Sequence, residues 1–239
     1  MENKYINCII EKGYNTDYIN SLLLAMFYKS SNIETILEYT KKTNTSFIYM
    51  QELIKSKFIE PLRCVYSISD NVINEIRNYA VICGWYNYMT DDMDDTVNNI
   101  DFIEQKNILN FYKFIIHLCD KNIFNNIIYN VKNNTNIKEI INLNNISYTP
   151  KFVCIQLNRE QNDNYDVDIM KQILINKSKL HIHSIICKDK NNKFYTVFLS
   201  YDKKWIYYDE NNIPSLKYID IDDYKENIML EVIMIFYVL

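Results

Sequence analysis

Residues 13–23 read Gly-Tyr-Asn-Thr-Asp-Tyr-Ile-Asn-Ser-Leu-Leu, and this stretch is the most informative part of the chain. Small polar residues that favour turns lead directly into an apolar run, NSLLLAMFYK, over residues 20–29. Side chains of Thr and Asp accept hydrogen bonds from the free amides at a helix start, so Thr16 or Asp17 is expected to cap a helix here. The stretch therefore predicts a turn followed by a buried helix.

The rest of the chain divides into a helical and a β-rich half. Apolar residues have helical spacing over residues 33–42, 47–58, 71–83 and 105–118. After the Asn-rich residues 120–147, where small strands and turns are expected, come five short β-branched and aromatic runs: 152–157, 182–187, 194–200, 205–208 and 228–238. Turn residues at 189–192 and 201–204 predict hairpins. Helices followed by strands indicate one α+β domain over residues 1–239, with a helical half (1–119) and an antiparallel β half (150–239).

Composition excludes several classes of protein. The 239 residues are 48% hydrophobic and 23% charged, which is enough apolar material for a packed core. Only 2 Gly and 3 Pro occur, which excludes collagen-like chains and Gly-rich phosphate loops. A net charge of −4 argues against a nucleic-acid partner. No apolar stretch reaches the roughly 18 residues of a membrane span, so no membrane partner is expected. The acidic run 91–104 is expected to be solvated.

The cysteines and the chain start indicate an intracellular, cytoplasmic protein. None of the six Cys forms a C-x-x-C pair, and no basic segment with a long apolar run opens the chain. His181, His183 and Cys187 have the spacing to share one strand face, but no motif supplies a fourth ligand, so neither metal nor cofactor is expected. Abundant Lys, Asn, Ile and Tyr point to an AT-rich genome such as that of a large DNA virus, which would place the protein in the host cytoplasm or virion.

The stretch 13–23 resembles the nucleophile box of the ubiquitin-specific proteases, roughly G-N-T-C-Y-x-N-S-x-L. Four later segments follow in the family's order. Residues 105–112 (QKNILNFY) resemble its Q-Q-D-x-x-E-F-L helix, and residues 150–159 (PKFVCIQLNR) resemble its P-x-x-L-x-I-x-L-x-R strand. Residues 193–198 (KFYTVF) and 205–209 (WIYYD) are similar to its G-H-Y-x-A-Y and W-Y-x-F-D-D hairpin, and residues 235–238 (IFYV) to its closing strand.

The resemblance covers nearly the whole chain and implies a papain-like fold. The helical half would be the family's thumb and the antiparallel β half its palm. The zinc-bearing fingers insertion of larger members is absent, because the chain has no C-x-x-C pair. The resemblance also implies ubiquitin, or a ubiquitin-like protein, as a partner.

The catalytic positions depart from the family pattern. The resemblance puts Asp17 where the family has its Cys nucleophile, Phe194 where it has its His base, and Asp209 at the retained acid. A carboxylate is a poor nucleophile toward an amide, a phenyl ring takes no proton, and Asp209 has no imidazole to orient. Both acids of the Q-Q-D-x-x-E box are also replaced, by Asn107 and Asn110. No catalytic residues are therefore expected.

Other positions remain binding candidates. Asn15 and Asn20 are candidates for an oxyanion-type pocket, although turn and cap roles explain both. The walls of the channel that takes a Gly-Gly tail in active relatives have four candidates: Gln105, Tyr195, Trp205 and Tyr208. Core or cross-strand packing by itself explains the three aromatic residues.

Three functions fit these observations. The leading hypothesis is a catalytically inactive pseudo-deubiquitinase that acts by binding ubiquitin, a ubiquitin-like modifier or another protein. The alternative is an active cysteine deubiquitinase that uses Cys8 or Cys187 with a His outside the usual positions. The third is a structural or assembly protein that has kept only the fold.

Overall fold

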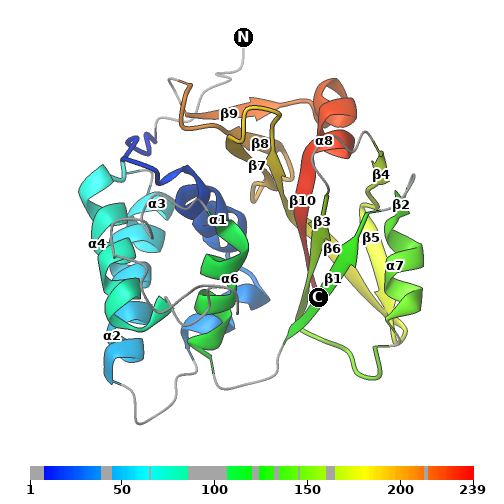
Figure 1. Ribbon diagram of the computed structural model, residues 1–239, viewed down its shortest axis with the longest axis horizontal. Coiled ribbons are helices and arrows are strands. Elements are labelled where there is room, and N and C mark those ends of the chain that lie inside the picture. The colour runs from blue at the N-terminus through cyan, green and yellow to red at the C-terminus, as the bar shows by residue number, and fades with distance from the viewer. Residues whose placement is uncertain are drawn as a thin grey trace, which may run out of the picture.

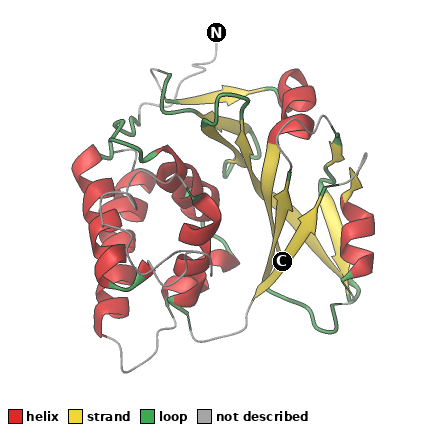
Figure 2. Ribbon diagram, viewed as in Figure 1, coloured by secondary structure: helices red, strands yellow, loops and turns green. Residues whose placement is uncertain are grey.

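The computed structural model describes residues 8–38, 45–64, 66–85, 107–119, 124–131, 135–144, 146–159, 165–212 and 215–239. One group of helices packs on one face of a large twisted sheet, and two short helices lie on the other side (Figures 1 and 2). Gln105 and the acidic run 91–104 lie outside the described residues. No helix in the described part of the chain is long and apolar enough to cross a membrane.

The helical group comes from the first half of the chain. It contains α1 (Asp17–Phe27), the 3-10 helix η1 (Asn32–Leu37), α2 (Thr45–Leu53), the π-helical segment η2 (Ile54–Ile59), α3 (Glu60–Arg63), α4 (Asp70–Ile82) and α6 (Ile108–His117). The predicted helix 33–42 is wrong in type and length. The Ser31 hydroxyl accepts from the Ile33 amide and Glu34 accepts from the Ser31 amide, which starts the tight 3-10 helix at Asn32.

The main sheet has the order β1-β3-β10-β6-β7-β8-β9, with β5 also pairing with β6. Its strands are β1 (Phe124–Asn130), β3 (Phe152–Asn158), β5 (Gln172–Ile175), β6 (Ser178–Lys188), β7 (Phe194–Leu199), β8 (Trp205–Tyr208), β9 (Leu216–Ile219) and β10 (Val232–Val238). β2 (Thr135–Asn136) and β4 (Val167–Asp168) form a separate parallel pair. Every pairing in the main sheet is antiparallel except that of β1 with β3.

Two predictions about the β half need correction. The sheet begins before residue 150, because β1 joins its edge and runs parallel to β3; such a pairing needs a crossover connection, which contains α7 (Ile137–Leu143). The predicted strand 228–238 begins only at Val232, after the helix α8 (Lys225–Glu231). Lys, Glu, Met and Leu in α8 favour a helix, whereas Val and Ile dominate the start of β10.

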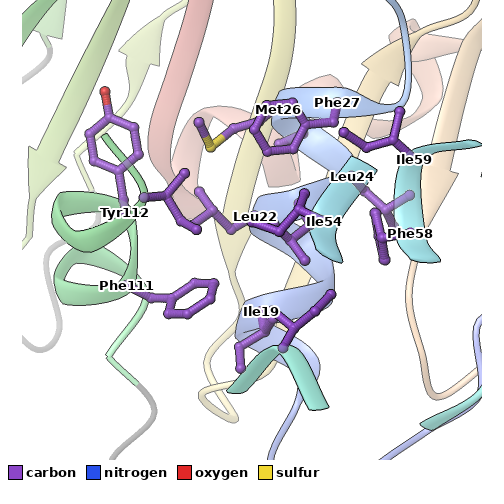
Figure 3. Close-up of a cluster of buried hydrophobic side chains, with 14 of the residues drawn as sticks. Ile19, Leu22, Leu24, Met26, Phe27, Ile54, Phe58, Ile59, Phe111 and Tyr112 are labelled. Atoms are coloured by element: carbon purple, nitrogen blue, oxygen red, sulfur yellow. The ribbon is translucent and has the colours of Figure 1, made fainter. Parts of the chain in front are cut away.

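The sheet separates two hydrophobic cores. The larger core joins the sheet to the helices of the first half, and the smaller one lies under α7 and α8. All eleven residues of α1 are buried, because this helix lies between the sheet and the surrounding helices. Figure 3 shows Ile19, Leu22 and Met26 of α1 among side chains of η2 and α6. Helix α1 is therefore the central element of the larger core.

Candidate functional site

The turn before α1 holds the residues that resemble the nucleophile box. Asn15 has a positive φ of 52°, which Asn tolerates better than most residues. The Thr16 hydroxyl accepts from the Gly13 amide at 3.2 Å, and a Cβ on Gly13 would lie 2.8 Å from that oxygen, so a larger residue here would displace the Thr16 side chain. Thr16 occupies the N-cap position, but its hydroxyl makes no cap bond. The prediction that Thr16 caps α1 is therefore wrong, because its hydroxyl oxygen accepts a hydrogen bond within the preceding turn. Asp17 is the first residue of the helix.

Hydrogen bonds fasten α1 to the centre of the sheet. The Thr196 hydroxyl of β7 donates to the Ser21 carbonyl at 3.0 Å, and the Ser184 hydroxyl of β6 donates to the Ala25 carbonyl at 2.6 Å. Ahead of the helix, the Lys12 ammonium donates to the Asn211 side chain at 2.7 Å. These contacts bring the nucleophile-like box against the hairpin that resembles the family's base and acid segments.

Phe194, which the sequence resemblance assigns to the base position, is part of an aromatic core. It is the first residue of β7 and is 2% exposed. Its ring centroid lies 6.5 Å from that of Tyr18, which also contacts the rings of Trp85 and Phe111, each at 6.3 Å. The side chain therefore contributes packing and has no atom that accepts a proton.

Asp209, which the sequence resemblance assigns to the acid position, closes a turn. One carboxylate oxygen accepts from the Asn211 amide and from the Asn211 side chain, both at 2.9 Å. The other oxygen accepts from the Asn212 side chain at 2.9 Å. This pattern, in which an Asp side chain bonds the backbone two residues later, is a common way to stabilise a turn.

Asp17 belongs to a buried polar neighbourhood. Burial raises the pKa of the Tyr208 phenol, the negative charge of Glu210 raises it further, the Asn20 side chain opposes the rise, and Asp17 and Asp209 add to it. Asp17, Asn20, Tyr208 and Glu210 are all buried. Tyr208 is therefore a neutral phenol among acidic groups.

The channel candidates lie on two faces of the sheet. Tyr208 packs in the larger core with α1, whereas Tyr195 and Trp205 belong to the smaller core on the opposite face. The structure therefore brings Tyr208 and Asn20 together near Asp17, but it does not put Tyr195 and Trp205 beside them. Gln105 is not among the described residues.

The cysteines of the alternative hypothesis are protonated thiols in buried surroundings. Cys8 donates to the Tyr66 carbonyl at 3.0 Å, and burial raises its pKa to about 11. Burial also raises the pKa of Cys187, which lies in the smaller core. A catalytic cysteine needs a lowered pKa, so neither environment suits a nucleophile.

The expected alignment of His181, His183 and Cys187 on one strand face is wrong. The register of β6 against β10 shifts so that Phe236 pairs with Ser184 and Tyr237 with Ile182, leaving His183 as an extra residue. This bulge directs both His183 and Ser184 toward α1, whereas Cys187 faces the smaller core. Among the described residues there is no group of three metal-ligating side chains.

A pocket on the α8 side of the sheet has no counterpart in the sequence analysis. Its lining residues are Asp189, Lys193, Phe194, Tyr195, Tyr207, Asp209, Tyr224, Asn227 and Glu231. Its residues come from turns, strands and helices spread over residues 189–231, so no single stretch carries a motif for it.

Only the comparison with solved structures finds proteins similar to this chain, and the similarity is one of fold. No protein-family model and no curated protein matches the chain, whereas 124 chains of solved structures do. An essential yeast splicing factor matches at a TM-score of 0.58 and 11% identity, over 98% of this chain and 70% of that one. A structure of the SAGA DUB module of Ubp8, Sgf11, Sus1 and Sgf73 bound to monoubiquitin matches at a TM-score of 0.59 and 10% sequence identity. The match covers 96% of this chain and 68% of that chain.

A second structure of the same kind of module matches at a TM-score of 0.55 and 10% identity, over 100% of this chain and 69% of that one. Identities this low are informative about the fold alone. The chain therefore has a fold similar to that of the Ubp8 DUB module, which supports the ubiquitin-specific-protease-like fold expected from its sequence.

Proposed function

We propose that this protein is a pseudo-deubiquitinase: a ubiquitin-specific-protease-like domain that binds ubiquitin, a ubiquitin-like modifier or another protein without cleaving it. The main support for the proposal is that a phenylalanine, Phe194, stands where the sequence resemblance places the base. In active relatives the corresponding position holds the His base. Here a phenyl ring fills it and packs against Tyr18 inside the larger core. General-base catalysis needs an atom that accepts a proton, and this ring has none.

The other two positions support the same conclusion. Asp17 is a carboxylate in a buried polar neighbourhood, and Asp209 holds the turn over residues 209–212. Catalytic groups of this kind act as a unit, so a retained acid does not compensate for a missing nucleophile and base. The helical half would then correspond to the thumb and the β half to the palm of a minimal form without fingers. A viral source and an intracellular site of action remain the expectation from composition.

Ubiquitin is the first partner to test, because one of the similar structures is a complex with monoubiquitin. Isotope-labelled ubiquitin is titrated with the purified chain, and amide chemical shifts are followed. We expect shifts around the hydrophobic patch and the C-terminal tail of ubiquitin. In parallel, a ubiquitin–fluorophore conjugate should release no fluorophore above the rate without protein.

A pair of tyrosine variants locates the contact on this chain. Tyr14 precedes α1 and is 67% exposed, whereas Tyr49 lies on α2 and is 49% exposed. Tyr14→Ser should weaken ubiquitin binding and Tyr49→Ser should not. Ubiquitin without its last two glycines separates binding of the tail from binding of the patch.

Two outcomes would contradict the proposal. Labelling of Cys8 or Cys187 by an electrophilic ubiquitin probe, together with turnover of the conjugate, would establish an active enzyme. Absence of shifts at high micromolar protein, together with concentration-dependent oligomers, would favour an assembly role.

A further inference from the structure

A surface pocket of about 220 Å³ lies beside β7, β8 and α8, on the side of the sheet opposite α1. Three of its lining residues are tyrosines from different elements: Tyr195 of β7, Tyr207 of β8 and Tyr224 of the 3-10 helix η4 (Ile221–Tyr224). The rings form a continuous series, with centroids 5.3 Å apart for Tyr195 and Tyr207 and 5.2 Å apart for Tyr207 and Tyr224. The pocket therefore has an aromatic wall.

The charged groups of the pocket are mostly acidic. Asp189, Asp209 and Glu231 line it together with one lysine, Lys193, so the charged lining comprises three carboxylates and one ammonium. Asp189 and Asp209 are held in fixed positions, because each accepts hydrogen bonds within its own turn. This balance favours a cationic ligand over an anionic one.

Glu231 is the best-placed acceptor. Its Oε2 atom accepts from the Tyr195 hydroxyl at 2.6 Å, which fixes the carboxylate at the pocket. Burial raises the pKa of Tyr195, so the phenol keeps its proton and remains the donor. The Oε1 atom has no hydrogen-bond donor among the residues that the structure describes. A fixed carboxylate with one oxygen available is a strong acceptor for a charged donor.

A lysine of the protein already uses the same rings. The Lys217 ammonium lies 4.8 Å from the Tyr207 centroid and 5.4 Å from the Tyr224 centroid. Cations are attracted to the faces of aromatic rings at such distances. Lys217 comes from β9 and is not part of the pocket lining, so it shows the preference of these rings without filling the pocket.

We infer that this pocket binds the side-chain ammonium of a lysine presented by a partner protein. The ammonium group has three donors, which match the open oxygen of Glu231 and the nearby carboxylates of Asp189 and Asp209. Its alkyl chain packs along the tyrosine rings. The site lies across the sheet from Asp17 and does not depend on ubiquitin binding, so its failure would leave the proposed function untouched.

Binding is tested with capped tripeptides and the full chain. The probe is acetyl-Gly-Lys-Gly-amide, titrated by ligand-observed NMR. Controls contain ε-acetyl-lysine, arginine or glutamate in place of lysine, and butylamine represents a free small cation. We expect the lysine peptide to bind at least about tenfold more tightly than the ε-acetyl-lysine and glutamate peptides, because a charged hydrogen bond is lost in both. Butylamine should bind more weakly than the lysine peptide if a protein partner is the ligand.

Variants on the same elements locate the site. Glu231→Gln keeps an acceptor for Tyr195 but removes the charge, and should weaken lysine-peptide binding about tenfold. Glu226→Gln, on the same helix and exposed, should leave it unchanged. Tyr224→Leu should weaken binding about two- to fivefold, with Tyr224→Phe close to wild type. Lys217→Met should strengthen binding, because it removes a positive charge beside the Tyr207 and Tyr224 rings.

The proposal is overturned if the ε-acetyl-lysine peptide binds as well as the lysine peptide. It is also overturned if Glu231→Gln and Glu226→Gln behave alike. Preferential binding of butylamine would assign the pocket to a small amine in place of a protein partner.

Discussion

His183 makes the stability of the protein sensitive to acid. The side chain is 4% exposed and lies in the bulge of β6, under the C-terminal part of α1. The pKa of His183 is lowered from its ordinary value of 6.5 to about 4, mainly by desolvation and also by the positive charge of Lys29. Hydrogen bonds to the backbone of Met26 and Ala25 and the negative charge of Glu34 act in the opposite direction. The folded protein therefore keeps this imidazole neutral.

The sign and size of the effect follow from proton linkage. Between pH 6.5 and 4, the unfolded chain binds a proton at residue 183 that the folded chain does not bind. The contribution of His183 to stability is thus present above pH 6.5 and is lost as the pH falls toward 4. For these two pKa values the loss between pH 7 and pH 5 is about 2 kcal/mol. In a chain of this length that is a fall in Tm of roughly 4–8 °C.

The assay compares urea unfolding of the wild type and His183→Gln at pH 7 and pH 5. Gln keeps a donor toward the α1 carbonyls but does not titrate in this range. We expect the variant to lose about 2 kcal/mol less than the wild type between the two pH values, because the exposed His117 and His181 are common to both proteins. Equal losses in both proteins would refute the reasoning.

Three further predictions concern α1 and the thiols. Thr196→Val removes the hydrogen bond to the Ser21 carbonyl and keeps the side-chain volume nearly unchanged. We expect it to lower Tm by about 2–4 °C in a thermal melt, whereas Thr149→Val, at an exposed position, should leave Tm unchanged. Asp17→Cys alone should not cleave a ubiquitin–fluorophore conjugate, because Phe194 supplies no base; robust turnover would show that another group does. Cys64 is the one exposed cysteine of the six, so the native protein should show one fast thiol, which Cys64→Ser removes.

The fold class and the main helix could be predicted from local pattern. The turn at 13–16, the apolar run behind it and the β-branched runs at 152–157, 194–200 and 205–208 correspond to α1, β3, β7 and β8. Periodicity and turn chemistry are local properties, so these elements are readable in the sequence. The order of the segments further indicated an α+β domain with a helical half followed by a β half.

Elements with mixed signals were harder to assign. Residues 228–231 continue the apolar run of β10 in the sequence but form the end of α8, and among them only Ile228 lies in the smaller core. The parallel pairing of β1 with β3 depends on the crossover through α7, which no pattern inside residues 124–130 reveals. The 3-10 helix η1 ends at Leu37, where the Glu38 amide donates to the Thr35 carbonyl, although the apolar spacing continues to residue 42.

By itself, the sequence determined which residues fall at the positions that resemble the family's catalytic ones, and a carboxyl group at residue 17 and a phenyl ring at residue 194 are neither a thiol nor a base. The tertiary structure alone decided which side chains meet. A one-residue bulge in β6 separates His183 from Cys187, and the alternation of β7 and β8 puts Phe194 and Tyr208 on one face and Tyr195 and Trp205 on the other. The lysine pocket also arises in this way, because strand pairing and the return of α8 onto the sheet bring together residues up to about forty positions apart. Chemical identity is encoded residue by residue, whereas a site depends on non-local packing.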